Sequence, residues 1–487
     1  SKLVKAWESK NAKNAAKAGG ISMMALSLAA CGGSSTTTTT TTTTTDTTTD
    51  TTTAANAIPF VNAGTTSLDT LTGTSGVDNF TAAAGRMDDG DVVNGVSGAD
   101  TLTATIDGSA DAYISNVPTV SITALGANAS MNGVRLQDVT NFNVDGGGTL
   151  TLTGAAAGIV YNVSGAGTAL TMTQAGTDST TDAVTVGLGA GALGTVTVGT
   201  AAGSGAVDFE TINLVIGGAG SATITEAGTP AFDATGDSIV VTGSGDYELN
   251  IDDVVVGAAT NTNGVATTIN AAEHTGALTL DLGVLDSTAL ENNASNWTGV
   301  DVIKAGLSGS NQIENIQAGT SVELVSVANA GASGDDLAIT AKGTGTADNV
   351  KVSFNTATAG TSIFMDVLTT TGIENVELHS TGADIPATAT AAATVIANTV
   401  DALTTTTIDT TLTISGDKKL TVNAVDAQVD TIVITNTTGS DVTVAAGGDL
   451  TYTGGAGVDR LELDTMADIT SADTLAGGDG KDTLALS

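Results

Sequence analysis

The sequence predicts an all-β protein, an elongated parallel β-helix in which short strands stack coil upon coil. Three observations support this prediction. Apolar residues alternate with Thr in short runs along the body of the chain, which is the pattern of half-buried strands. Glycine is abundant, at 61 residues, and Pro is scarce, at 4, which suits strands joined by tight turns. Aromatic residues make up only 3% of the chain, so the core has to be built from Val, Leu, Ile, Ala and Thr.

The predicted strands recur along most of the chain. Several start 10–11 residues apart, at 149, 159 and 169, and others are separated by 14–19 residues. Tandem β-sandwich domains are the alternative, because this spacing also suits antiparallel strands, but sandwich cores usually hold more aromatic residues. Only residues 387–402 approach a helical pattern, and the Thr at alternate positions leaves that segment ambiguous. The alternating runs are 149–153, 169–173, 183–186, 195–198, 277–282 and 420–422.

Residues 1–33 are predicted to be an export or lipid-anchor segment. Five Lys lie within positions 1–17, and an apolar run follows at 21–30. Such a run is too short to span a bilayer, which takes about 20 residues, and fits the apolar part of a signal peptide. The run ends at Leu28-Ala-Ala-Cys31, which resembles a bacterial lipobox and predicts lipidation of Cys31. A retained amphipathic helix over residues 2–17 is the alternative.

The charge of the chain excludes several partners. With 52 acidic and 14 basic residues, the net charge is −38. Positions 1–17 hold five of the bases and one acid, so the rest of the chain carries 9 bases against 51 acids, or −42. This balance argues against nucleic-acid binding and against adhesion of the body to an anionic bilayer. A single Cys excludes an internal disulfide, and the two His, at 274 and 379, suggest no catalytic arrangement. We therefore expect a protein that is not an enzyme.

A looser repeat marks several strand starts. Four of these starts share an apolar–acid–x–apolar pattern, and residues 139–144 are similar but lack the acid. Their irregular spacing predicts imperfect coils with loops of varying length. We expect most acids outside the turns described next to be solvated loop charge. The four starts are residues 209–214, 300–303, 313–316 and 373–378.

Two pairs of Gly/Asp turns carry the predicted chemistry. Residues 454–462 and 477–485 match the pattern G-G-x-G-x-D-x-U-x, where U is a large apolar residue, at every fixed position. Two copies near the start each lack the second Gly. The predicted metal-ligating residues of the C-terminal pair are Gly454, Gly455, Gly457, Asp459, Gly477, Gly478, Gly480 and Asp482. Those of the N-terminal pair are Gly73, Gly76, Asp78, Gly95, Gly98 and Asp100.

The residue types in these turns suit a hard cation. Glycine allows positive φ and a bare backbone, so carbonyl oxygens can converge, and Asp adds a charged oxygen. Because Ca²⁺ takes 6–8 oxygen ligands, two stacked turns are needed. The turns start at positions 73 and 95 in the first pair and at 454 and 477 in the second, so each pair is predicted to form one calcium site. The alternative is a glycine-rich turn whose Asp caps the backbone.

From about residue 60 onward the chain resembles the RTX-type S-layer and surface-adhesin proteins of Gram-negative bacteria. The four Gly/Asp turns carry the resemblance, and the Thr-rich strands and low Lys content agree with it. It implies a calcium-dependent β-solenoid that assembles outside the outer membrane. The predicted regions are an export or anchor segment (1–33), a Thr-rich disordered linker (34–57), a degenerate turn pair (58–108), a strand-repeat solenoid (109–450) and a turn pair (451–487) that we expect to be truncated.

The predicted function is that of a calcium-dependent structural component of an S-layer-like surface coat. Its expected location is extracellular, at the cell surface, with an outer-membrane lipid anchor if Cys31 is modified. The expected partners are like chains or outer-membrane surface components. One alternative is an adhesin that binds carbohydrate through exposed Thr ladders, which needs a regular array that the irregular spacing disfavours. Another is a β-helix enzyme that degrades polysaccharides, for which basic residues are too sparse.

Overall fold

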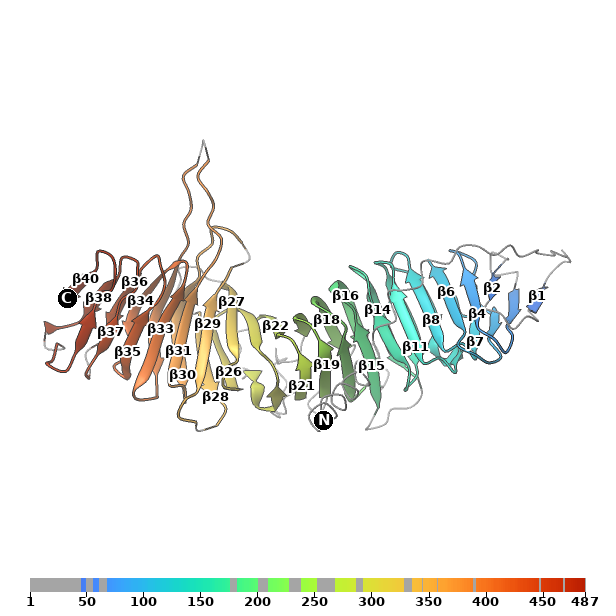
Figure 1. The fold of residues 1–487 in the computed structure, drawn as a ribbon, viewed down its shortest axis with the longest axis horizontal. Helices are drawn as coiled ribbons and strands as arrows, with labels where there is room; N and C mark the ends of the chain where they lie inside the picture. The colour runs from blue at the N-terminus through green and yellow to red at the C-terminus, as the bar shows by residue number, and fades with distance from the viewer. Residues whose placement is uncertain are drawn as a thin grey trace, which may run out of the picture. The chain divides into compact units, whose positions relative to one another are not determined.

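A computed structural model shows a parallel β-solenoid, as the sequence predicts (Figure 1). The chain divides into two compact units, residues 1–46 and 47–487, and almost all of the structure described here belongs to the second. Every strand ladder whose register is described is parallel, which excludes tandem antiparallel sandwiches for these residues. The structure describes residues 45–49, 56–60, 68–175, 182–199, 209–226, 238–251, 268–285, 292–327, 335–343, 345–356, 358–388, 391–445, 448–466 and 469–486.

Four parallel sheets, named A to D here, form the walls of the solenoid. Sheet A contains β1 (Thr45–Thr49), β3 (Leu68–Thr72), β5 (Val92–Asn94), β7 (Tyr113–Ser115) and β10 (Leu136–Gln137). Sheet B contains β2 (Asn56–Pro59), β4 (Asp78–Ala82), β6 (Thr101–Ile106), β8 (Thr119–Ala124), β11 (Asn141–Asp145), β13 (Val160–Val163), β15 (Ala183–Leu188), β17 (Thr211–Ile216), β19 (Ser238–Ser244), β21 (Thr268–Thr275) and β24 (Trp297–Thr298).

The other two sheets continue toward the C-terminus. Sheet C contains β9 (Ala129–Asn132), β12 (Thr149–Ala155), β14 (Ala169–Gln174), β16 (Gly191–Val198), β18 (Gly220–Glu226), β20 (Tyr247–Ile251), β22 (Leu278–Val284), β25 (Val302–Leu307), β27 (Ser321–Val327), β29 (Asn349–Phe354), β31 (Asn375–Ser380), β33 (Thr410–Gly416), β35 (Val429–Ile434), β37 (Thr451–Thr453) and β39 (Thr474–Ala476). Sheet D contains β23 (Asn292–Asn293), β26 (Ser310–Ile316), β28 (Asp336–Ala341), β30 (Phe364–Thr371), β32 (Ala397–Thr405), β34 (Lys419–Val425), β36 (Ser440–Val444), β38 (Arg460–Leu463) and β40 (Thr483–Leu486).

Each predicted alternating run lies in a strand, except that Ala277 precedes β22. The Val, Leu and Met residues of these runs are buried, and their Thr are half-buried or exposed. In β12, Leu150 and Leu152 are fully buried, and they align with Leu170 and Met172 of β14 in the next coil. The interior is therefore a column of aliphatic side chains, with few aromatic contacts such as Phe142 on Tyr161, whose ring centroids are 5.9 Å apart. Consecutive predicted strands belong to opposite walls, which explains the short intervals between their starts.

The solenoid changes walls at two short 3₁₀ turns, η1 (Gly133–Arg135) and η2 (Ala294–Asn296). Sheet A ends and sheet C begins around η1, whereas sheet B ends and sheet D begins around η2. Both turns start from an Asn cap, because Asn132 accepts a hydrogen bond from Val134 N and Asn293 accepts one from Ser295 N. The first coils thus have walls A and B, the middle coils B and C, and the last coils C and D.

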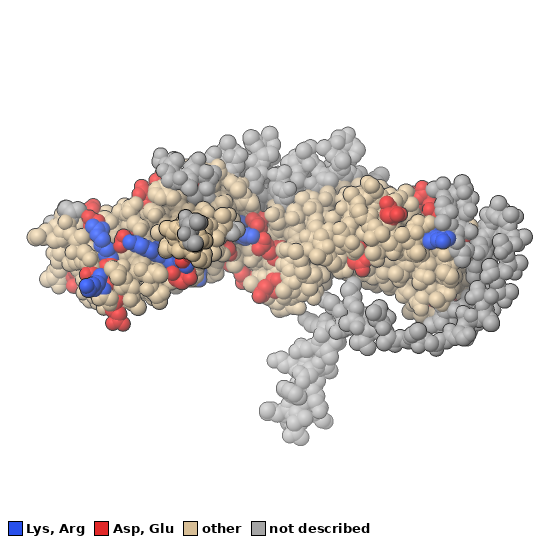
Figure 2. Space-filling model, turned by 90° about the horizontal axis from the view of Figure 1, so that it is seen from above, with Lys and Arg blue, Asp and Glu red and all other residues tan. Residues whose placement is uncertain are grey.

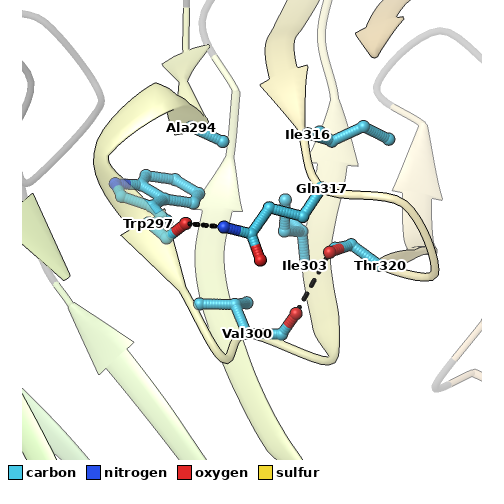
Figure 3. Close-up of a pocket in the computed structure, with 7 residues that line it drawn as sticks. All are labelled: Ala294, Trp297, Val300, Ile303, Ile316, Gln317 and Thr320. Atoms are coloured by element: carbon cyan, nitrogen blue, oxygen red, sulfur yellow. Dashed lines mark hydrogen bonds between the residues drawn. The ribbon is translucent and has the colours of Figure 1, made fainter. Parts of the chain in front are cut away.

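A small cavity lies at the second wall change (Figure 3). Gln317 Nε2 donates to Trp297 O at 2.7 Å, and Thr320 Oγ1 donates to Val300 O at 3.1 Å, so side chains of the following coil hold this corner. The enclosed space is about 10 Å³, roughly enough for one water molecule. The lining residues are Ala294, Trp297, Val300, Ile303, Ile316, Gln317 and Thr320.

The structure describes several of the predicted regions only in part. Of the segment 1–33, including Cys31, no residue is described, so that prediction lies outside the described residues. Within the predicted linker 34–57, residues 45–49 form β1 and residues 56–57 begin β2. Residues 387–402 contain no helix where they are described, and residues 397–402 belong to β32. In the described part of the chain, no helix is both long and apolar enough to cross a membrane.

Candidate metal centre

The two predicted turn pairs each form a stack at one corner of the solenoid. The N-terminal turns, 73–77 and 95–100, join sheet A to sheet B on consecutive coils, as the pairing of Thr72 with Asn94 shows. The C-terminal turns, 454–459 and 477–482, join sheet C to sheet D, and Thr453 pairs with Ala476. The two turns of each pair are therefore one coil apart. The structure brings together the members of each pair and assigns the two pairs to different corners.

In the N-terminal stack, both aspartates are fully buried. Asp78 Oδ2 accepts hydrogen bonds from Thr74 N at 2.6 Å and from Thr74 Oγ1 at 3.1 Å. Asp100 Oδ1 accepts one from Asp78 N at 2.7 Å, which ties the second coil to the first. Among the described residues, Asp78 Oδ1 and Asp100 Oδ2 are buried with no hydrogen-bond partner. Two buried carboxylates thus each hold one unsatisfied oxygen.

Burial of the two carboxylates favours a compensating positive charge at this corner. The pKa of Asp100 is raised above its ordinary value, first by burial and also by the neighbouring charge of Asp78, while the hydrogen bond from Asp78 N opposes the shift. A buried carboxylate without full hydrogen bonding is costly unless a proton or a cation compensates it. The unsatisfied oxygens therefore suit a bound cation.

Backbone oxygens come close to the glycines of the same corner because these residues have no side chain. A Cβ on Gly73 would lie 2.6 Å from Asp78 Oδ2 and 3.1 Å from Gly95 O. A Cβ on Gly95 would collide with both Asn116 O and Asp100 Oδ2. Gly98 has φ of +133°, and a Cβ there would collide with Gly76 O. Carboxylate and carbonyl oxygens are the ligands that Ca²⁺ prefers, so the donor set fits this ion.

The C-terminal stack repeats these hydrogen bonds with a different outcome. Asp459 is buried, but its Oδ1 accepts from Ser440 N at 2.8 Å and its Oδ2 from Gly455 N at 2.7 Å, so both oxygens have partners. Asp482 Oδ1 accepts from Asp459 N at 3.1 Å, and Asp482 is exposed. Asp459 therefore caps the backbone, as in the alternative that the sequence left open. Close stacking with the neighbouring coils requires Gly454, Gly457, Gly478 and Gly480, whereas Gly477 leaves room for Asp482 in its own turn.

The large apolar residue of each motif enters the core in three of the four turns. Phe80 and Leu102 are fully buried, and Leu461 is 4% exposed. Leu484, in the last coil that the structure describes, is 52% exposed.

A further group of buried aspartates lies beside the N-terminal stack. Asp91 Oδ1 accepts from Asp69 N at 2.8 Å and Oδ2 from Asp88 N at 2.7 Å, and burial raises the pKa of Asp91. Five of the seven buried aspartates in the described residues lie between positions 69 and 100. Sequence reasoning missed Asp69, Asp88 and Asp91, although the run Asp88-Asp-Gly-Asp91 was an available signal.

The acids of the looser repeat also have a structural role. Three of them accept a backbone N–H from the previous coil: Glu210 from Asp182 at 2.6 Å, Asp301 from Leu278 at 2.8 Å, and Glu374 from Asp348 at 2.7 Å. Such charge-assisted bonds are stronger than neutral ones. These three acids therefore do more than add solvated charge, because each joins two coils.

A third acidic group lies at a D-to-C corner of the last coils. Asp430 borders a cavity of about 20 Å³ together with Asp449. The pKa of Asp430 is raised by burial first, and then by a hydrogen bond to Asp409 and the charges of Asp409 and Asp449. In the described part of the chain, no set of three or more His, Cys, Asp or Glu side chains is arranged to hold a metal ion. A cation at either turn stack would thus take at most two carboxylates, with backbone oxygens and water completing its shell.

The cluster around His379 resembles a hydrolase site only in composition. His379 Nδ1 lies 2.7 Å from Ser415 Oγ, and Ser415 Oγ donates to Glu377 Oε1 at 2.5 Å. In a Ser-His-acid triad the His lies between the other two residues, but here the Ser does. The pKa of His379 is lowered by burial first and by the charge of Lys351, with Glu377 and Asp417 opposing. This order of contacts does not activate Ser415 as a nucleophile.

Comparisons of the chain with protein-family models, with curated proteins and with solved structures found no match.

Proposed function

We propose that this chain is a non-enzymatic structural protein that forms part of an S-layer-like surface coat. In this proposal it is a β-solenoid of the RTX type that bound calcium stabilises. One observation supports it above the others: Asp78 Oδ1 and Asp100 Oδ2 are buried without a hydrogen-bond partner among the described residues. Calcium at this corner would neutralise both carboxylates and join two consecutive coils. Outside cells, where calcium is millimolar, a site of modest affinity, with Kd of about 10⁻⁴–10⁻³ M, is sufficient.

Two observations from other parts of the chain agree with a structural role. The two cavities described above hold about 10 and 20 Å³, whereas a site for a small organic ligand typically takes about 300 Å³ or more. In low calcium, repulsion within a chain of net charge −38 opposes compaction, which suits export before folding. Self-association and attachment to the outer membrane through Cys31 belong to the same proposal.

The test is calcium titration of chelator-treated full-length protein. We expect calcium to bind and to raise Tm, followed by circular dichroism, with magnesium at equal ionic strength as the control. The double substitution Asp78→Asn and Asp100→Asn should abolish most of the gain in Tm, whereas Asp459→Asn should retain it. Absence of calcium binding would overturn the proposed function. Retention of the full gain by the double variant would show that the ion binds elsewhere.

An adhesin that binds carbohydrate is a second candidate, and one observation favours it. Despite the irregular chain spacing, strand register aligns two uncharged columns on the outer face of sheet B. Hydroxyl and amide groups of this kind can hydrogen-bond sugars. The first column is Asn79, Thr101, Thr119 and Asn141, and the second is Thr81, Thr103, Ser121 and Asn143.

A glycan-array assay discriminates between the two candidates. If sheet B binds sugar, Thr103→Lys should remove the signal, while Thr171→Lys, on the outer face of sheet C, should not. Absence of glycan binding by the unmodified protein would leave the coat role as the single candidate.

A further inference from the structure

One connection between sheets C and D leaves the solenoid as a projecting arm (Figure 1, orange). Residues 381–396 join β31 to β32, whereas the next such connection in the chain, residues 417–418, is a tight turn. Ile385 N donates to Thr394 O and Thr394 N to Ile385 O, both at 2.9 Å, so the arm is an antiparallel pair on a solenoid of parallel ladders.

The base of this arm is fixed to the body. Asp384 Oδ2 accepts from Lys418 Nζ at 2.9 Å, and its Oδ1 accepts from Ile396 N at 2.9 Å. Gly360 N donates to Ala383 O at 2.6 Å, and a Cβ on Gly360 would lie 2.5 Å from Ile385 Cδ1. Ile396 is fully buried. The arm is therefore held in a defined direction at its base.

The arm differs chemically from the rest of the chain. Residues 385–400 contain no ionisable side chain, although the chain carries a net charge of −38. Val395 is 67% exposed and Ile385 is 43% exposed. Figure 2 looks down on this side of the solenoid and shows Asp and Glu distributed over the body. Beyond Asp384 at its base, the arm is thus an exposed, uncharged and partly apolar feature on an acidic protein.

One edge of the arm is unprotected against pairing. Exposed strand edges are usually guarded by charge or by Pro. Pro386 guards the first strand, but residues 391–395 contain neither. Because Thr394 directs its backbone groups toward Ile385, strand alternation turns those of Ala393 and Val395 toward the open side. Within the described residues, neither Ala393 nor Val395 makes a backbone hydrogen bond.

We infer that the 391–395 edge of the arm pairs antiparallel with the same edge of a second copy of this chain. Two chains of net charge −38 repel at contact, and salt screens this repulsion beyond about 8–10 Å. An uncharged arm that stands away from the body lets two copies touch while their acidic surfaces stay apart. The same edge from both copies forms a two-fold contact, in which identical surfaces are complementary. A basic partner would instead be drawn to the acidic body.

This inference rests on the proposed self-assembly and identifies the residues that make the contact. The test measures self-association of the full-length chain and its variants by sedimentation velocity, under reducing conditions and across a concentration series. We expect Val395→Asp to weaken dimerisation by about tenfold or more, because a charged side chain guards a strand edge against pairing. Ile408→Asp is the matched control, since Ile408 is 68% exposed in the turn between β32 and β33, and it should dimerise like the unmodified protein.

A second variant separates pairing from charge. Ala393→Pro removes an outward N–H without adding charge and should also weaken the dimer, with circular dichroism unchanged because the arm lies outside the core. If the unmodified chain stays monomeric at every concentration, or if Val395→Asp and Ala393→Pro associate normally, the arm contact is wrong. Calcium binding and its effect on Tm are read separately, so failure of the arm contact leaves the calcium proposal standing, and the reverse also holds.

Discussion

The two Gly/Asp stacks share one set of hydrogen bonds but differ in burial. In both, the later Asp accepts the backbone N–H of the earlier Asp, Asp100 from Asp78 and Asp482 from Asp459. The N-terminal copies depart from the motif, yet both of their carboxylates are fully buried and partly unsatisfied. The C-terminal copies match the motif, yet Asp459 is saturated by backbone and Asp482 is exposed. The stack that matches the motif better is therefore the one whose buried carboxylate oxygens already have hydrogen-bond partners. The stack that matches it less well holds the unsatisfied oxygens that a cation would compensate.

The largest expected difference between the stacks is the loss of stability when the first glycine of the later turn is changed to Ala. Gly95→Ala forces a Cβ against Asn116 O and the buried Asp100, and should destabilise the first coils by about 3 kcal/mol. At the equivalent Gly477, the Cβ meets the exposed Asp482, which can move, so Gly477→Ala should cost less. Hydrogen exchange of peptides from each stack measures both effects.

Gly108→Ala is the control for this pair, because a Cβ on Gly108 meets no atom within 4 Å and φ is not positive. Equal losses of protection in Gly95→Ala and Gly477→Ala would remove the distinction between the stacks.

The second difference concerns the capping aspartates of the C-terminal stack. Asp459→Ala leaves Ser440 N and Gly455 N without their acceptors in a buried turn, and should cost about 2 kcal/mol. Asp482→Ala removes one bond from an exposed residue and should cost less than about 1 kcal/mol. Hydrogen exchange at Ser440 and Gly455 reports the loss. If Asp459→Ala leaves both amides protected, the capping role is wrong.

The third difference is the direction in which stability changes with pH when a chelator has removed calcium. Because the pKa of Asp100 is raised above 3.8, the folded state holds its proton more tightly, so the N-terminal coils should lose stability as pH rises through that pKa. The pKa of Asp473 is lowered below 3.8 by backbone bonds from Leu450 and Thr470, so coils near it should lose stability as pH falls toward that pKa.

Exchange protection measured from pH 3 to 6 checks these opposite slopes. Asp100→Asn should flatten the N-terminal slope and leave that near Asp473 unchanged. A slope near the first stack that survives in Asp100→Asn would assign it to other groups, of which Asp91 is the first to test.

The smallest effect concerns the acids that join coils elsewhere. Glu374→Gln keeps an acceptor for Asp348 N and should change stability by less than about 1 kcal/mol, whereas Glu374→Ala should cost about 1 kcal/mol more. Thermal unfolding compared between the two variants measures this difference. Identical Tm values would show that the neutral and missing acceptors are equivalent at this corner.

Much of the fold was predictable because a strand needs only local information. Residues 149–153 and 169–173 alternate Thr with apolar residues, and both lie in strands whose apolar side chains face the core. The wall changes at η1 and η2 were not predicted, since they depend on which earlier strand each new strand pairs with. The outward columns of sheet B were missed for the same reason. The strands are unevenly spaced along the chain, but loops of different length bring them into register in the sheet.

The sequence by itself determined an acidic, aromatic-poor β-solenoid and the positions of its Gly/Asp turns, because alternation and glycine requirements act over a few residues. Only the tertiary structure decided which carboxylates are buried, capped or exposed. Asp78 and Asp459 occupy the same motif position, but the free oxygen of one and the saturation of the other depend on backbone groups one coil away. The same holds for the arm between β31 and β32, whose described residues belong to none of the four sheets.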